Sequence, residues 1–301
     1  MFKLRKKLVS DQIKGLCFAL LAMLGGGLYA IPYRLSLENV PPMTVIWGVF
    51  LWAFLFSLPG AWFARRQKII SWKIAGITLV TSLAGLLGNY AICQALSLAS
   101  PTLLVLVSRI EIIIAILLSW MFFREFVSIR IWVAVVVIFV GIIVMKMDSL
   151  SFELKDWSSF FWALTSAFSF ALMQVLAKRI INEINPQVLN ASRLAIALVI
   201  LWGLAEVRSG IVDLQSSEWK WLALAAFCGP FLGRVSYTYA LRYLTISKAV
   251  IIGSFSPVTT LLFELIVFGT IISNYEALGG TIMLAGILWV FIPGLRQTTS
   301  K

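Results

Sequence analysis

The sequence RLSLENVP at residues 34–41 has a counterpart, RIINEINP, at residues 179–186. Both octets fit the pattern R-x3-E-x2-P, and they begin 145 residues apart. The same offset pairs a further set of identical residues: Ala22 with Ala167, Gly88 with Gly233, Ala95-Leu96 with Ala240-Leu241, Leu117 with Leu262, Phe123 with Phe268 and Gly141 with Gly286. A constant offset is the signature of an internal repeat, so we expect two structurally equivalent halves.

Each half contains five apolar stretches of membrane-spanning length. They cover approximately residues 13–35, 43–64, 72–96, 101–123, 130–147, 157–179, 187–207, 219–243, 248–270 and 276–293. Five is an odd number, so the second half would lie inverted in the bilayer, as in transporters with a substrate site near the midplane. The expected fold is an all-α membrane protein with ten transmembrane helices in two inverted five-helix repeats. The repeats would cover residues 1–147 and 157–301, joined by an exterior linker at 148–156.

The composition argues against several other classes of protein. Hydrophobic residues make up 60% of the chain and mean hydropathy is +0.96, so a soluble globular domain is not expected. The net charge of +12 comes from basic residues at helix ends, not from one stripe, which argues against a nucleic-acid partner. Histidine is absent, and Cys17, Cys93 and Cys228 all lie in apolar stretches. We therefore expect no metal site, disulfide framework or cofactor.

Lysine and arginine residues are distributed unevenly over the two sides of the expected bundle. With a cytoplasmic N-terminus, that side would hold seventeen of them and the opposite side five. Cytoplasmic loops carry the excess of basic residues, so we expect a multi-pass protein of the cytoplasmic (inner) membrane with both termini cytoplasmic. The basic segment KLRKK at residues 3–7 resembles the start of a signal peptide. Cleavage would remove a helix that the repeat requires, so we expect an uncleaved first helix.

Five ionisable residues fall within the apolar stretches: Arg109, Glu111, Arg193, Arg234 and Glu264. Each would cost roughly 2.5–3.5 kcal/mol at the centre of a membrane helix, so such residues normally face a wet cavity or one another. Internal ion pairs that only hold helices together are the structural alternative. Arg109 and Glu111 are two positions apart, about 200° around a helix, so only one of them is expected to face a cavity.

Arg234 and its counterpart in the first repeat define the expected substrate site. Arg234 shares a helix face with Tyr237, and a cation beside a hydroxyl group could bind a carboxylate or phosphate. The repeat places Asn89, followed by Gln94, on the opposite side of the pseudo-axis. Trp47 lies deeper than the interfacial tryptophans, and it could stack on an apolar part of the substrate.

Two further residues could gate the pathway or couple it to an ion. Arg193 lies near the start of its helix and could snorkel to the interface, so the roles of gate and anchor both stay open. Glu264 and Glu111 are the acids at membrane depth that could carry a coupling proton. Helix breakers near these positions could kink the helices or allow close packing. They are Gly85, Gly88, Pro230, Gly233 and Pro257.

Several residues resemble those of a known family of membrane proteins. The third helix of each repeat ends in alanine-leucine, at Ala95-Leu96 and Ala240-Leu241, and Pro257 lies in the fourth helix of the second repeat. With ten expected helices in 301 residues, the chain resembles the drug/metabolite transporter superfamily, in particular its EamA-like members. The resemblance implies a secondary transporter of the cytoplasmic membrane, often an exporter of amino acids or other small metabolites. It assigns no binding residue.

The chain also departs from that family at identifiable positions. In many members the fourth helix of the repeat ends in a Gly-Glu pair. The equivalent pairs here are Arg124-Glu125 and Gly269-Thr270, so each copy keeps only half of the motif. Ile112 stands where the first repeat would place the proline that matches Pro257.

Two transport hypotheses follow from the membrane-depth charges. Three arginines against two glutamates favour a small anionic or zwitterionic metabolite, such as an amino acid, moved by alternating access. The alternative is proton-coupled efflux of amphipathic cationic compounds, with Glu111 and Glu264 as the binding residues. An intramembrane enzyme is disfavoured because the sequence holds no nucleophile–base pair or phosphate-binding glycine loop. A channel or scaffold subunit is a third alternative. Solute flux that saturates and shows counterflow would distinguish a transporter from it. The expected partners are a small solute, the lipid bilayer and a coupling ion, for which the proton is one candidate.

Overall fold

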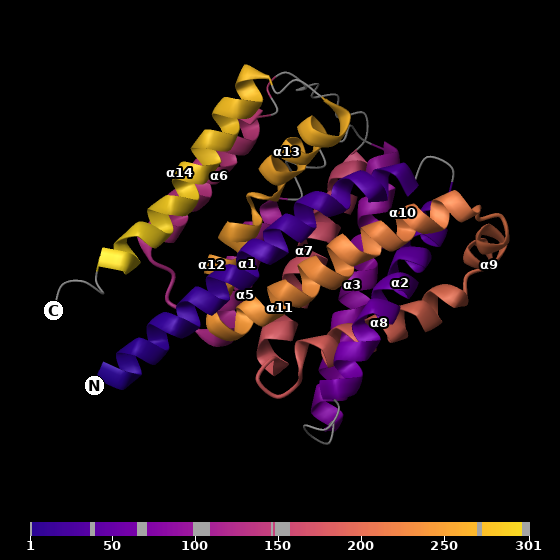
Figure 1. Ribbon diagram of the computed structural model, residues 1–301, viewed down its shortest axis with the longest axis horizontal. Helices are drawn as coiled ribbons and strands as arrows, with labels where there is room; N and C mark the ends of the chain where they lie inside the picture. The colour runs from indigo at the N-terminus through magenta and orange to yellow at the C-terminus, as the bar shows by residue number, and fades with distance from the viewer. Residues whose placement is uncertain are drawn as a thin grey trace.

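The computed structural model describes residues 2–36, 40–64, 71–98, 109–145, 147, 157–269 and 273–296. Over these residues the chain is a bundle of α-helices without a β-strand (Figure 1). The start of α1 and the end of α14 lie at the same end of the molecule. The linker expected at 148–156 lies outside the described residues.

The first half of the chain forms the helices that its apolar stretches predict. They are α1 (Phe2–Ser36), α2 (Pro42–Ala64), α3 (Trp72–Leu98), α5 (Ile110–Phe123) and α6 (Ile129–Met145). Of the stretch expected at 101–123, residues 101–108 lie outside the described part of the chain.

The second half is divided into more pieces than the sequence predicts. Its helices are α7 (Trp157–Ile180), α8 (Pro186–Trp202), α9 (Ala205–Val212), α10 (Ser216–Ala226), η3 (Phe227–Gly233), α11 (Arg234–Tyr243), α12 (Ile246–Gly253), α13 (Ser256–Phe268) and α14 (Asn274–Arg296). The helix expected over 187–207 is wrong at its end, because α8 stops at Trp202 and α9 leaves at 92° to it. Gly203 follows α8, and Leu204 is extended, with φ −80° and ψ 131°, so the helix cannot continue.

Both interruptions within the expected spans 219–243 and 248–270 occur at a proline that the sequence marks as a breaker. Pro230 lies inside η3, a π-helical segment between α10 and α11. Proline has no N–H to donate, and such π segments accommodate a disrupted helical ladder. Pro257 lies in the first turn of α13, where its missing N–H costs nothing, and α12 ends just before it at Gly253.

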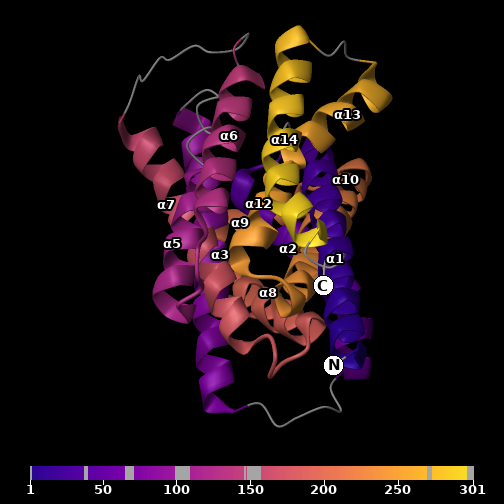
Figure 2. The same cartoon turned by 90° about the vertical axis from the view of Figure 1, so that its left-hand side faces the viewer.

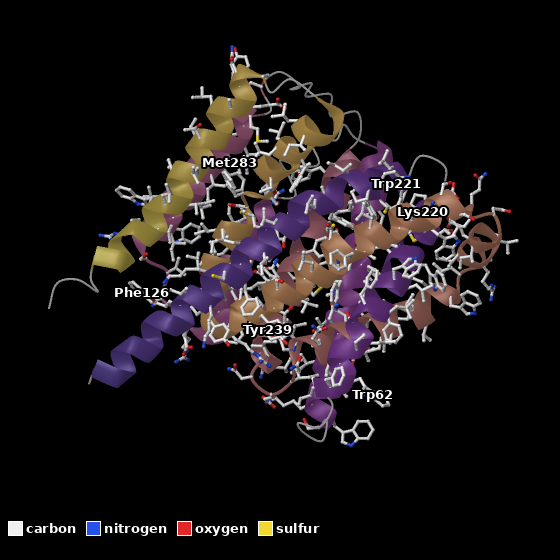
Figure 3. The ribbon with its side chains drawn as sticks, viewed as in Figure 1. Trp62, Phe126, Lys220, Trp221, Tyr239 and Met283 are labelled. Atoms are coloured by element: carbon white, nitrogen blue, oxygen red, sulfur yellow. The ribbon has the colours of Figure 1, made fainter. Side chains whose placement is uncertain are left out.

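Within the described part of the chain, five helical stretches are long and apolar enough to cross a membrane by length and composition. They are Asp11–Tyr33, Pro42–Ala64, Trp72–Ala95, Phe160–Ile180 and Ile246–Phe263. The bent pair α8 and α9 would add a sixth if it forms one span, and α5 and α6 are shorter apolar helices. The side chains agree with a lipid environment, because Trp62 and Phe126 project from the surface with 70% and 91% of their area exposed (Figure 3). The structure is that of a multi-pass membrane protein; the number of ten helices stays a prediction.

Helix ends recur at the repeat offset of 145 residues. α5 ends at Phe123 and α13 at Phe268, and each is followed by a residue in the left-handed conformation. These residues are Arg124, with φ 52°, and Gly269, with φ 63°. Glycine adopts this conformation without steric cost, whereas an arginine does not. The glycine half of the family motif is therefore a helix C-cap.

The helices pack in pairs that relate the two halves. α1 packs against α10, η3 and α11, and α7 packs against α3, so the first helix of each half contacts the third helix of the other half. α6 and α14 pack against each other at one side of the bundle (Figures 1 and 2). Their backbones approach closely at Gly141 and Gly279, and the side chain of Met283 is fully buried between them (Figure 3).

Candidate functional site

A cavity of about 770 Å³ lies between the helices of the two halves. Phe50 on α2 comes from one large apolar cluster, and Ile112 on α5 and Val250 on α12 come from another; all three line the cavity. Its polar lining consists of Tyr29, Tyr33, Asn89, Arg109, Glu111, Gln174, Arg193, Arg234, Tyr237, Ser254 and Ser256. The volume is in the range of pockets that enclose a small organic molecule.

Arg234 is the first residue of α11, directly after the π-helical segment η3. Its guanidinium carbon lies 5.7 Å from the centre of the Phe170 ring, within the range of a cation–π contact. No hydrogen bond or ion pair of its guanidinium occurs among the described residues. Its N–H groups are therefore available to a ligand in the cavity. π-Helical segments are frequent at functional sites, which agrees with this position.

A chain of hydrogen bonds holds Glu111 at the cavity wall. The Tyr237 hydroxyl donates to Gln174 Oε1 at 2.6 Å, and Gln174 Nε2 donates to Glu111 Oε1. Tyr237 was predicted beside Arg234, and the structure brings both to the cavity. Gln174 was not predicted from the sequence, because it carries no charge. A neutral amide in the middle of an apolar stretch is the signal that could have identified it.

Arg109 and Glu111 both line the same cavity, which corrects the expectation that only one would face it. Arg109 is the N-cap residue of α5, and its backbone, with φ −69° and ψ −12°, is close to helical. Both side chains nevertheless reach the cavity wall, so position around the helix does not decide which of them lines it. Arg109 Nε is buried without a hydrogen-bond partner among the described residues.

Arg193 lines the cavity and is only 7% exposed. Its Nη2 donates to Asn190 Oδ1 at 2.9 Å, and its Nη1 lies 3.2 Å from Met173 Sδ. Asn190 in turn donates to Ser57 Oγ and to Pro230 O, both at 3.0 Å. The guanidinium is thus held by neutral groups that connect α2, α7, α8 and η3.

The remaining predicted site residues are divided between the cavity and the packing around it. Asn89 lines the cavity and donates to Gly85 O at 2.7 Å. Trp47 and Gln94 are not among the lining residues, and Trp47 packs against Trp202 with 5.6 Å between ring centres. The side chain of Glu264 lies outside the described part of the structure.

The predicted helix breakers also have different positions. Pro230 and Gly233 line the cavity within η3, whereas Pro257 lies at the start of α13. A methyl group at Gly85 would lie 3.0 Å from Arg193 Nη1, and one at Gly88 would lie 3.0 Å from the Phe170 ring. α3 runs through both glycines as one helix, so their smallness leaves room for side chains of the cavity wall.

A reciprocal set of contacts, here called the carbonyl clamp, joins the end of α7 to the end of α11. Lys178, near the end of α7, donates to the carbonyl groups of Leu241 and of Leu244, the latter at 2.6 Å. Arg242, near the end of α11, donates to Ile181 O at 3.0 Å and to Ile184 O at 2.8 Å. Each helix thereby supplies a cation to the unsatisfied carbonyl groups at the end of the other, which is a favourable arrangement at helix C-termini.

A smaller cavity shares part of its wall with the main cavity and also includes Leu241, whose carbonyl group belongs to the clamp. This small cavity of about 20 Å³, enough for about one water molecule, is lined by Arg193, Arg234 and Gln174 and also by Leu241. The first repeat has Tyr33 and Ser97 at the positions equivalent to Lys178 and Arg242. Tyr33 lines the main cavity, so the first half has no lysine or arginine at either clamp position.

A multi-pass helical membrane protein with a polar cavity of metabolite size belongs to the class of membrane transporters by its architecture. Residues 13–147 and 157–292 each match the EamA-like transporter family. The chain therefore belongs to that family and has a membrane transport function. The described residues contain no group of three or more acidic, cysteine or histidine side chains that could hold a metal ion.

Two proteins with similar sequences carry names that agree with this assignment, and one solved structure shares the fold. An uncharacterized transporter of Synechocystis sp. is 22% identical over 247 residues, which are 79% of this chain and 70% of that protein. A protein of Saccharomyces cerevisiae named as a probable transport protein is 36% identical over 74 residues, 25% of this chain and 21% of its own length. A crystal structure with 18% identity has the same fold, with a TM-score of 0.74 over 96% of this chain and 99% of that one.

Proposed function

We propose that this protein is a secondary active transporter that exports a small anionic or zwitterionic metabolite, such as an amino acid, across the cytoplasmic membrane. The observation that carries the proposal is the cavity of about 770 Å³ whose wall includes Arg234, a guanidinium without a hydrogen bond or ion pair among the described residues. A planar guanidinium binds carboxylate or phosphate through two parallel hydrogen bonds, and it remains charged at any physiological pH. The export direction rests on the family resemblance.

Alternating access would follow from the relation between the two halves, residues 1–147 and 157–301. Each half contributes its first helix to the third helix of the other half, which is the pairing that a two-fold relation between inverted repeats requires. With both termini cytoplasmic, as the distribution of lysine and arginine predicts, the carbonyl clamp would close the cytoplasmic end of the cavity. Opening would separate α7 from α11, and η3 and the break before Pro257 are places where the helices can bend.

Proton-coupled efflux of amphipathic cations is the second candidate function. It is supported by Glu111, whose carboxylate faces a cavity with the aromatic residues Tyr29, Tyr33 and Phe170 in its wall. A cationic solute would have to enter beside three guanidinium groups, which repel it. The two functions differ in which residue they require: Arg234 for the anion and Glu111 for the cation.

The test compares export by cells that produce wild-type protein, Arg234→Gln or the control Arg208→Gln. Arg208 is an exposed arginine on α9, away from the cavity, so its loss controls for the change in net charge. Untargeted mass spectrometry of the medium, at matched amounts of protein in the membrane, should find an acidic or zwitterionic metabolite that depends on Arg234 and not on Arg208. If Arg234→Gln exports normally while Glu111→Gln does not, the anion proposal is refuted in favour of the cationic one.

A further inference from the structure

The charges around the cavity do not balance. Among the described residues, its lining holds three arginines, Arg109, Arg193 and Arg234, and one carboxylate, that of Glu111. Arginine does not lose its proton in proteins, so the arginines contribute three full positive charges. Even with Glu111 ionised, two positive charges remain without a counterion in a region of low dielectric. Such charges are normally neutralised by a partner.

No protein group among the described residues supplies that partner. The ion pair found there joins Lys14 and Asp11 on α1, outside the cavity. Arg193 is satisfied by the neutral groups of Asn190 and Met173, which hold the guanidinium in place but leave its charge uncompensated. The fixed cations are thus arranged before any ligand enters, and their net charge is available to the ligand.

The positive charges are placed at more than one point of the wall. Arg193 and Arg234 also line the small cavity of about 20 Å³ next to the carbonyl clamp, whereas Arg109 lines the main cavity only. Glu111 interacts electrostatically with both Arg234 and Arg109, and it already accepts a hydrogen bond from Gln174. It can offset one arginine at most. Apolar side chains such as Ile92 and Val250 form other parts of the wall, where a short carbon skeleton could lie.

We propose that the substrate is a dianion, meaning a small metabolite with two ionised acidic groups, such as a dicarboxylate, or with one phosphate monoester. A dianion neutralises the two excess charges, a monoanion neutralises one, and a simple zwitterion neutralises none. One acidic group binds at Arg193 and Arg234, and the other, or the remaining oxygens of a phosphate, meets Arg109. The inference rests on the proposed function and narrows its substrate class.

The test is isothermal titration of the detergent-purified wild-type protein with matched pairs of small molecules at fixed ionic strength. Butanoate is compared with butanedioate, and glycerol with glycerol phosphate, at about pH 8, where a phosphate monoester carries nearly two charges. The dianion of a pair should bind about 10- to 100-fold more tightly, the effect of one additional charged hydrogen-bonded contact. The two arms also distinguish a dicarboxylate from a phosphate ester as the preferred dianion.

Variants assign the selectivity to the residues. Arg109→Gln should reduce the preference of butanedioate over butanoate to about twofold or less, and Arg109→Lys, which keeps the charge, should preserve most of it. If butanoate binds as tightly as butanedioate and Arg234→Gln abolishes both, the dianion proposal fails and the anion transporter stands. If none of butanoate, butanedioate and glycerol phosphate binds, or only lipophilic cations bind, both proposals fail. An unchanged preference in Arg109→Gln would also overturn the inference.

Discussion

If the carbonyl clamp closes the cytoplasmic end of the cavity, as proposed, removing the ammonium group of Lys178 should open it there. Lys178→Met keeps most of the apolar stem of the side chain. It removes the ammonium group, and with it both hydrogen bonds to the carbonyl groups of Leu241 and Leu244. Both bonds come from one ammonium group, and we count them together as one charged contact of about 1.5–3 kcal/mol, which corresponds to about a 10- to 150-fold change in an equilibrium between closed and open states. Arg242 and its two carbonyl partners remain, so the clamp is weakened and not abolished.

The opening can be measured as the reactivity of a cysteine at position 238. Thr238 lines the small cavity that also includes Leu241 of the clamp, and it is only 5% exposed, so a Thr238→Cys reporter is shielded in this structure. Cys17, Cys93 and Cys228 would first be replaced by alanine, and the activity of that background checked. A membrane-impermeant maleimide is then applied to vesicles of each orientation. Lys178→Met should accelerate labelling about 10- to 150-fold from the clamp side only.

Lys220→Met is the matched control, because Lys220 is an exposed lysine on α10 (Figure 3). It should leave the labelling rate of the reporter unchanged from either side. Equal labelling of wild type and Lys178→Met from the clamp side would refute the idea that these contacts close a gate. Faster labelling from both sides would point to general loosening of the protein and would count against it equally.

Three further predictions concern stability and the cavity wall. Arg124→Gly should stabilise the protein by about 1 kcal/mol, because glycine adopts the left-handed backbone at this position without steric cost. Gly269→Ala should destabilise it for the opposite reason. Melting temperatures in detergent should therefore rise for the first variant and fall for the second. Gly279→Ala should lower stability by about 1–3 kcal/mol, since its methyl group would lie 2.5 Å from a carbonyl oxygen of α6. Gly76→Ala is the control, because open space surrounds that position, and it should not lower stability. Similar melting temperatures for the two variants would contradict the tight packing of α6 against α14. Tyr237→Phe removes one hydrogen bond from the chain that holds Glu111, so anion affinity in titrations should fall about 2- to 10-fold without loss of thermal stability; full affinity would show that this chain does not organise the site.

The sequence was most informative where a physical cost does not depend on the surrounding fold. A charge at membrane depth is expensive in any helix, and Arg109, Glu111, Arg193 and Arg234 all line one cavity. Proline lacks the N–H that a helical ladder uses, and Pro230 and Pro257 both lie at interruptions, whereas Pro32 and Pro59 lie inside α1 and α2. The family assignment also follows from the sequence, since both halves match the EamA-like family.

Features that depend on contacts between distant segments could not be predicted in the same way. The bonds from Lys178 to carbonyl groups more than 60 residues away use backbone atoms, which every residue has, so no side-chain pattern indicates them. Trp47 was considered a substrate contact because of its depth, but depth does not determine which way an indole points, and it packs against Trp202. The bend after Trp202 arises at a single glycine and an extended leucine inside a continuous apolar run.

The central claim is that the arginine-lined cavity binds an anionic solute. The most direct measurement is the thermal stability of purified wild-type protein and Arg234→Gln against anionic, zwitterionic and cationic metabolites at constant ionic strength. A ligand at a hundred times its dissociation constant should stabilise the protein by about 2.7 kcal/mol. We predict that acidic metabolites stabilise the wild type and lose this effect in Arg234→Gln. Stabilisation by lipophilic cations alone, or by acidic metabolites equally in both proteins, would contradict the claim.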